Sequence, residues 1–369
     1  MIRKFAFLLG LMFLVNFMNA QVQDTIVEED FSQYENVGFA DDGAKRYCSP
    51  KIYDLSPQRL ISVSWDQQLG YEAFSSRPGE YDKDDSALFG HKGNIDKTAG
   101  LRLFANIPII SKNELVWQMG LNFVNTNYDI NSITPQGNEP NAELNNGMLS
   151  GLDARGLTSA GVHSTIFKPL GEKSFLLFQG SADLNGDYGF DDVPSLSKLR
   201  YSGAVIWGKR SNDRKQWGVG ISRTYRVGEM NYIPVVMFNW TAPNRKYGTE
   251  ILFPARANFR LTINPRNLIL IGYELEGASY HLANLSNTNT NYELRRSELR
   301  AKVEYQRQIK GFVWFSAQAG WRNDYSFNVD RIEGDGDFFR GFFGNQKYSQ
   351  LNSLTNPVYF NIGIHLVSP

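Results

Sequence analysis

Charged side chains recur at every second position in the last third of the chain. Between Glu298 and Glu304 they alternate with apolar residues, which puts them together on one face of a β-strand. The predicted cluster of inward charges is Arg256, Arg260, Glu274, Glu276, Arg296, Glu298, Arg300, Lys302 and Glu304. Such a cluster fits a constriction that selects solutes by charge, or a ladder of ion pairs between strands. Because both signs are interleaved, the ladder is favoured, and the constriction remains the alternative.

Side chains suited to hydrolysis or metal binding are sparse. His163 and Ser164 are adjacent, and neighbours on a strand point to opposite faces, so we do not expect them to pair as base and nucleophile. Glu333 to Asp337 alternate carboxylates with glycine, but they lack the full spacing of a calcium loop, so a flexible acidic loop is favoured. Cys48 is the only cysteine, which excludes an internal disulfide and a cysteine-based metal site. We therefore predict a protein that is not an enzyme and that has no cofactor and no metal site.

Alternation with a period of two predicts the elements that position these side chains. Apolar residues share one face at 115–123, 176–184, 199–207 and 299–305. Outside the first twenty residues, no apolar run approaches the roughly 18 residues that a membrane helix needs. Aromatic residues make up 14% of the chain although the mean hydropathy is −0.37. In a barrel only every second strand residue must be apolar, so the sequence predicts an all-β fold, a transmembrane antiparallel β-barrel.

The lengths of the connections indicate orientation and strand number. Short links near 108–114, 169–173, 209–215, 241–247, 264–267 and 308–311 alternate with long ones near 75–94, 128–156, 187–198, 278–291 and 323–355. This is the pattern of short periplasmic turns and long outer loops. Proline cannot donate to a strand ladder, so Pro254 predicts a hairpin or sharp break within 249–263. The prediction is about fourteen strands, with twelve as the alternative.

Four tryptophans indicate where the membrane interface lies. Trp117, Trp207, Trp217 and Trp240 fall close to the predicted periplasmic turns and on the outward-facing parity. Indole rings prefer the headgroup region of a bilayer, so these residues are predicted to form an aromatic girdle. The alternative is that they are core residues of a soluble sheet.

The N-terminus carries the features of an export signal. Arg3 and Lys4 precede an apolar stretch from Phe5 to Val15, and Ala20 precedes the predicted cleavage site. We predict a signal peptide over residues 1–20, a partly disordered periplasmic segment over 21–56 and the barrel over 57–369. Removal of the signal peptide would leave the protein in the cell outer membrane.

The C-terminus ends on an amphipathic strand, in which Phe360, Ile362 and Ile364 alternate with polar residues or glycine. It resembles the assembly signal of outer-membrane proteins, although the last residue is Pro369 and not an aromatic residue. The expected partners are therefore outer-membrane lipid and the outer-membrane assembly machinery. Lys+Arg and Asp+Glu number 38 each, and this balance argues against a nucleic-acid partner.

Several short stretches resemble an uncharacterised Bacteroidota outer-membrane β-barrel family, a domain of unknown function named DUF6268. They are Leu55 to Asp66, Ile233-Pro234-Val235, Leu252-Phe253-Pro254 and Tyr273 to Gly277. The resemblance extends over about residues 47–367. It implies an outer-membrane barrel of unknown function and supplies no catalytic residues.

Two classes of function follow from these features. One is a porin-like channel or transporter for small solutes or hydrophobic compounds, of unknown substrate. The alternative is a non-transporting barrel that is structural or binds a partner through its outer loops. A lumen blocked by the charged residues or by segment 21–56 would favour the second class, and a continuous water path would favour the first. The sequence fixes neither the lumen width nor the oligomeric state.

Overall fold

The computed structural model describes residues 52, 55–76, 90–135, 147–224, 231–283, 285, 292–331 and 348–367. The predicted signal peptide, Cys48, the acidic stretch Glu333 to Asp337 and most of segment 21–56 lie outside these ranges. The chain divides into the units Met1–Ala44 and Lys45–Pro369, and the second unit holds every described residue. None of the helices in the described ranges is long and apolar enough to span a membrane.

Antiparallel strands form almost all of the second unit. Their bounds are β1 (Arg59–Gln68), β2 (Tyr71–Ser76), β3 (His91–Lys112), β4 (Leu115–Pro135), β5 (Leu157–Pro169), β6 (Ser174–Gly186), β7 (Arg200–Asn212), β8 (Lys215–Thr224), β9 (Asn231–Thr241), β10 (Tyr247–Phe253), β11 (Arg256–Asn264), β12 (Asn267–Leu282), β13 (Tyr292–Lys310), β14 (Val313–Arg331), β15 (Leu351–Leu354) and β16 (Val358–Val367). One α-helix, α2 (Met148–Arg155), and one 3-10 helix, η4 (Leu196–Lys198), lie in the connections.

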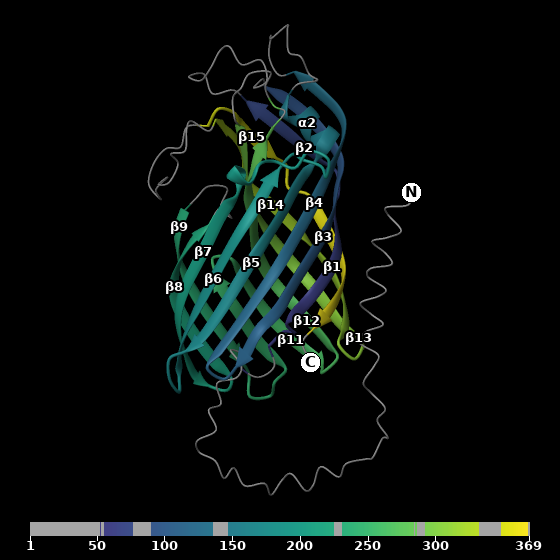
Figure 1. Cartoon of the computed structure of the whole chain (residues 1–369). Helices are drawn as coiled ribbons and strands as arrows, with labels where there is room; N and C mark the ends of the chain where they lie inside the picture. The colour runs from purple at the N-terminus through teal and green to yellow at the C-terminus, as the bar shows by residue number, and fades with distance from the viewer. Residues whose placement is uncertain are drawn as a thin grey trace, which may run out of the picture. The chain divides into compact units, whose positions relative to one another are not determined.

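The sheet closes on itself through β1, which pairs with β16 on one side and with β3 on the other. The ring contains fourteen strands, which confirms the predicted number, and β2 and β15 lie outside it. The break at Pro254 is confirmed, because β10 ends at Phe253 and β11 begins at Arg256. Closure pairs the edge strands, which is what a sheet within lipid requires. Figure 1 shows the strands running obliquely around this barrel.

Side chains alternate between the two sides of the wall. On β1, Ile61, Val63 and Trp65 are exposed on the outer face, whereas Ser62 and Asp66 are buried on the inner face. The same division holds around the ring, with exposed apolar residues such as Leu121, Val219 and Ile362 outside. An apolar outer face on a closed antiparallel ring is the architecture of outer-membrane β-barrels.

The two ends of the barrel differ. At the end that we call the turn end, adjacent strands are joined by short connections, at the positions predicted from the sequence. The opposite, loop end is uneven, because β3 and β4 have 22 and 21 residues whereas β10 and β11 have 7 and 9. Several predicted outer loops were too long: β4 continues to Pro135, β14 continues to Arg331, and residues 148–155 form α2. These extensions carry polar residues on both faces, so the alternation that marks a membrane strand is lost there.

A second, narrower ring closes at the loop end, above the short strands. The end of β6 pairs with β12 at Gly186 and His281, and the Asp187 amide donates to the His281 carbonyl at 3.1 Å. On the other side, Val329 of β14 and Gln350 exchange two backbone hydrogen bonds next to β15. This ring consists of β12, β13, β14, β15, β2, β3, β4, β5 and β6, and leaves out β7 to β11 together with β1 and β16. We call the β6–β12 contact the clasp.

An apolar core fills the narrow ring. Met148, Leu149 and Leu152 of α2 project into it and meet buried side chains from the surrounding strands. The surrounding residues include Tyr71, Ile95, Tyr128, Leu157, Leu282, Leu294, Phe327 and Val329. In Figure 1, α2, β2 and β15 gather at the end of the barrel away from the C-terminus. The loop end is therefore closed by a hydrophobic core, which we call the upper seal.

Gly186 allows the two strands of the clasp to approach. A Cβ at this position would lie 2.8 Å from the backbone oxygen of His281. We expect Gly186→Ala to destabilise the barrel by roughly 1–3 kcal/mol, because backbone must shift to relieve the overlap. The readout is the temperature at which the compact band is lost in heat-modifiability electrophoresis. Gly189→Ala is the matched control, since nothing lies within 4 Å of a Cβ there. Equal melting of both variants would show that the clasp does not depend on this close approach.

Candidate functional site: the lumen

Glu298 lies at the centre of the charged residues inside the barrel. Its side chain has 0% exposure and contacts three guanidinium groups, those of Arg300 at 2.5 Å, Arg296 at 2.9 Å and Arg322 at 3.4 Å. Arg300 also reaches Asp66 of β1 at 2.8 Å. A carboxylate without solvent needs such partners, because burying an unpaired charge is very unfavourable.

One of the ion pairs between non-adjacent strands joins β3 to β12. Arg102 of β3 donates two hydrogen bonds to Glu276 of β12, at 2.7 and 2.8 Å. The strands β1, β16, β14 and β13 lie between β3 and β12 around the wall. The pair is therefore a chord across the ring and not a contact between neighbouring strands. With Asp66, Glu298, Arg300 and Arg322 it forms a connected set, which we call the brace.

Most of the predicted charge cluster belongs to the brace or adjoins it. Lys302 lies 2.9 Å from Glu274 and 3.3 Å from Glu304, and Glu304 pairs with Arg59. Arg260 stands apart, with Glu250 at 3.4 Å and the Thr241 hydroxyl at 2.9 Å. Arg256 lies exposed at the loop-end rim of β11, without an ion pair among the described residues.

Sequence reasoning missed five members of this charged set, namely Arg59, Asp66, Arg102, Glu250 and Arg322. Four of them carry the inward parity of their strands, as the pairing of Asp66 with Gly100 and of Glu250 with Asn258 illustrates. Arg59 has the outward parity of β1 and reaches Glu304 through the register shift between Arg59 and Ile61. That parity was the available signal. It indicates which face a residue occupies, but not which residue it meets across the lumen.

The brace divides the lumen into two unequal parts. On the side of β13, β14, β16 and β1, inward side chains are buried, as Arg322, Ser316 and His365 illustrate. On the side of β4 to β12, inward residues remain accessible to solvent: Gln179 is exposed, and Glu274 and Glu276 retain 32% and 29% exposure. We call this second part the chamber.

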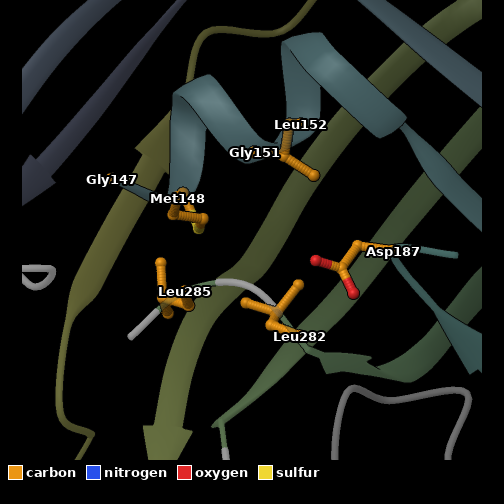
Figure 2. A pocket seen from close by; sticks show the side chains of 7 residues that line it. All are labelled: Gly147, Met148, Gly151, Leu152, Asp187, Leu282 and Leu285. Carbon is orange, nitrogen blue, oxygen red and sulfur yellow. The ribbon is translucent and has the colours of Figure 1, made fainter. Parts of the chain in front are cut away.

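Apolar groups close the chamber toward both ends. At the loop end the upper seal contains a small pocket, lined by Gly147, Met148, Gly151, Leu152, Asp187, Leu282 and Leu285. In Figure 2, the Asp187 carboxylate lies beside Leu282, below α2, and its Oδ1 accepts the Ala283 amide at 2.8 Å. Toward the turn end a second apolar cluster is formed by Val116, Phe167, Phe175, Ile206, Val235 and Met237.

Residues 56 to 59 cross the lumen below the brace. Ser56 donates to Glu250 Oε1 from its amide at 2.9 Å and from its hydroxyl at 2.8 Å. The Gln58 side chain then donates to Gln118 of β4 at 3.1 Å, and Arg59 begins β1. Because β10 lies across the ring from β1, the chain spans the lumen before it enters the wall. The lower seal, as we call it, consists of this crossing and of the second apolar cluster described above, which includes Val116 and Met237.

The four predicted girdle residues lie on the outer face near the turn end. Trp207 and Trp217 meet edge to face at 5.6 Å between ring centroids. The Trp117 indole donates to the Ser164 hydroxyl at 2.9 Å. Trp240 has the outward parity of β9, between the inward Asn239 and Thr241. Their place at a membrane interface stays a prediction.

Histidine and serine side chains do not assemble a reactive site in the described part of the chain. His163 faces inward and stacks on Phe104, whereas Ser164 faces outward to Trp117, as expected for neighbours on a strand. His365 bonds Ser62 and Ser316 through its two ring nitrogens, each at 2.6 Å, and has 2% exposure. The ranges with described coordinates contain no group of three or more His, Cys, Asp and Glu residues that could hold a metal ion.

The brace yields a stability prediction. We expect Glu298→Gln to lower the free energy of unfolding by roughly 3–5 kcal/mol, because three guanidinium groups lose a buried counter-charge. Urea titration of the barrel refolded in detergent micelles measures this change. Glu274→Gln is the control, since its carboxylate is 32% exposed and pairs with Lys302, so that its loss should cost about 1 kcal/mol or less. The account of the brace fails if the two variants unfold at the same urea concentration.

Comparison with known proteins gives weak structural likenesses and one family match. No curated protein matches the chain. A KdgM porin in complex with disordered oligogalacturonate shares 8% identity, with 84% of this chain and 99% of that chain covered, at a TM-score of 0.31. An outer-membrane channel from Pseudomonas putida F1 shares 10% identity, with 85% of this chain and 98% of that chain covered, at a TM-score of 0.34. The Pseudomonas putida toluene transporter TodX shares 8% identity, with 84% of this chain and 90% of that chain covered, at a TM-score of 0.32. These identities and scores are too low to carry a functional argument.

The family match covers most of the barrel. The sequence profile of a domain of unknown function, DUF6268, matches residues 112–367. The matched stretch begins at the end of β3 and ends with β16, so it includes the turn at Pro254 and most of the brace. The chain belongs to the DUF6268 family.

Proposed function

We propose that the protein is a gated outer-membrane channel for small polar solutes, closed in the state described above. The observation that carries this proposal is the chamber, a solvent-accessible section of lumen between two apolar seals. A barrel with a purely structural role would gain stability from a filled interior on both sides of the brace. Here only the side of β13, β14, β16 and β1 is filled.

The charged residues act in this proposal as a brace and not as a selectivity filter. Glu298 and Arg300 form ion pairs with one another and with neighbouring charges, and both are withdrawn from solvent. A filter needs charges that face the solute. The wall that faces the chamber is mostly uncharged, with Gln179, Asn122 and Ser181 on the inward face of β4 and β6.

The two seals are the elements that must move for a solute to pass. The upper seal depends on α2, a helix of 8 residues that is held by Met148, Leu149 and Leu152. The crossing of the lower seal is anchored to the chamber wall by the two Ser56 hydrogen bonds to Glu250. Both are small contacts compared with the ladders of the wall, so they can open while the barrel stays closed.

A second candidate is a non-transporting barrel that acts through its outer loops. The blockage of the lumen by the brace and by the crossing at Ser56 favours it. The two candidates differ in one respect: only the first requires that weakening the seals opens a path for ions.

The setting of the protein is also part of the proposal. We infer export with removal of residues 1–20, residues 21–56 as a periplasmic segment, and insertion by the outer-membrane assembly machinery through the β16 signal. Lipid would cover the apolar outer face, with Trp117, Trp207, Trp217 and Trp240 at the periplasmic interface. The resemblance of the strand sequences supports a Bacteroidota origin. We propose no catalytic activity.

Conductance across a planar bilayer tests the gate. The triple variant Leu149→Ala, Leu152→Ala and Ser56→Pro weakens both seals, and the proline removes both Ser56 donors without touching the Glu250–Arg260 pair. Each Leu→Ala change in a core costs roughly 2–5 kcal/mol, and every 1.4 kcal/mol is a factor of ten in an equilibrium. We expect the intact barrel to be nearly silent and the triple variant to be open at least about ten times more often.

The control variant is Leu170→Ala with Leu196→Ala, since both leucines are exposed outside the seals. It should be as silent as the intact barrel. If the triple variant also stays silent while heat-modifiability shows that it is folded, the channel is excluded and the non-transporting barrel is supported.

A further inference from the structure

Phe104 is the one large apolar residue on the described strands of the ring that faces inward and is still exposed. It shares the inward parity of Arg102, since Ser64 pairs with Arg102 and Ser62 pairs with Phe104. Its exposure is 37%, whereas the other exposed apolar side chains of the described strands of the ring have outward parity. An aromatic ring that faces water on a polar inner wall is unfavourable for folding alone, so it needs another explanation.

Polar side chains surround the Phe104 ring. Its back is supported by the His163 imidazole, with ring centroids 5.0 Å apart and planes at 11°. In the pairing register, Asn122 lies directly beside Phe104 on β4. The Asn122 amide donates to Asp183 Oδ1 at 3.2 Å, and the Ser181 hydroxyl donates to Asp183 Oδ2 at 2.7 Å.

Two glycines bring this group together. A Cβ on Gly120 would overlap the His163 ring, and a Cβ on Gly161 would overlap the Asp183 carboxylate. The absence of a side chain at Gly120 and at Gly161 thus makes room for the imidazole over β4 and for the carboxylate over β5. We call Phe104, Asn122, His163, Ser181 and Asp183 the platform.

We propose that the platform binds the ring of a neutral sugar. One face of a pyranose presents C–H groups that pack on an aromatic ring, while its edge presents hydroxyl groups. Asp183, as a carboxylate, accepts up to four hydrogen bonds, and Asn122 offers both a donor and an acceptor. The role of this site in transport rests on the proposed channel, but the binding itself does not.

The groups near the platform disfavour two other classes of small solute. Asp183 has no ion pair among the described residues and would repel an anion. Arg102, two residues from Phe104 on β3, is neutralised by Glu276 and Asp66, so it does not exclude a cation, and choline is therefore included as a competing probe. A purely aromatic solute would leave the acceptors of Asp183 and Asn122 without hydroxyl partners, which costs affinity.

Calorimetric titration of the refolded full chain tests the proposal. The probes are D-glucose, D-galactose and maltose, in a detergent without a sugar headgroup. We expect at least one of them to bind, and Phe104→Ala to weaken that binding about tenfold, in line with the loss of one good stacking contact. Phe104→Tyr should restore it. Phe259→Ala, which removes an exposed ring from the outer face, should leave it unchanged.

The titration is repeated in the triple variant with weakened seals, so that a blocked entrance is not mistaken for a missing site. Binding that depends on Phe104 in either background supports the proposal. It is overturned if none of the three sugars binds in either background, or if Phe104→Ala binds a sugar as tightly as its parent does. It is also overturned if choline or indole binds at the platform and the sugars do not. Sugar binding in a barrel that never conducts would refute the channel and keep the site.

Discussion

Charges within a barrel that has little water beside them must be paired, and the rest of this structure is arranged around that constraint. Arg102 and Glu276 meet across the ring with two hydrogen bonds, and Arg300 carries the contact on to Asp66 and Glu298. Removing a single ion from water costs a large desolvation free energy, and an ion of opposite charge at hydrogen-bond distance offsets much of that cost. The pairing therefore fixes which strands face each other, and makes one side of the lumen solid while the other stays open.

The unequal lengths of the strands produce the narrow ring at the loop end. β7 to β11 end early, so β6 and β12 meet above them, and Gly186 lets their backbones approach. The narrow ring that results has a circumference small enough for α2 and the surrounding apolar side chains to fill. One sheet thus supplies both a wide section with an accessible chamber and a narrow section with a core. A molecule that held only the wide section would lack the upper seal, and one that held only the narrow section would have no chamber.

Local patterns in the sequence were sufficient to predict the closed ring of strands and the residues on its inner face. Proline 254 ended a strand because it lacks an amide, and alternation put Glu298 and Arg300 inside. The cross-lumen partners could not be predicted, because parity gives a face but not a distance, and no run of alternating charges marks Asp66 on β1 or Arg102 on β3. The clasp was missed for the same reason, since His281 and Gly186 are far apart in sequence. At the loop end, polar residues such as Asn323 and Asp324 occupy both faces of β14, so the sequence predicts a loop where the strand in fact continues to Arg331.

The central claim is that Arg102 and Glu276 form a chord that holds the lumen in two parts. A double-mutant cycle on the unfolding free energy tests it most directly, with Arg102→Ala, Glu276→Ala and the double variant. We expect a favourable coupling energy above about 1 kcal/mol between these two residues, because each single variant already removes the same ion pair. Effects that add to within about 0.5 kcal/mol would show that the pair does not act as a unit, and would contradict the division of the lumen.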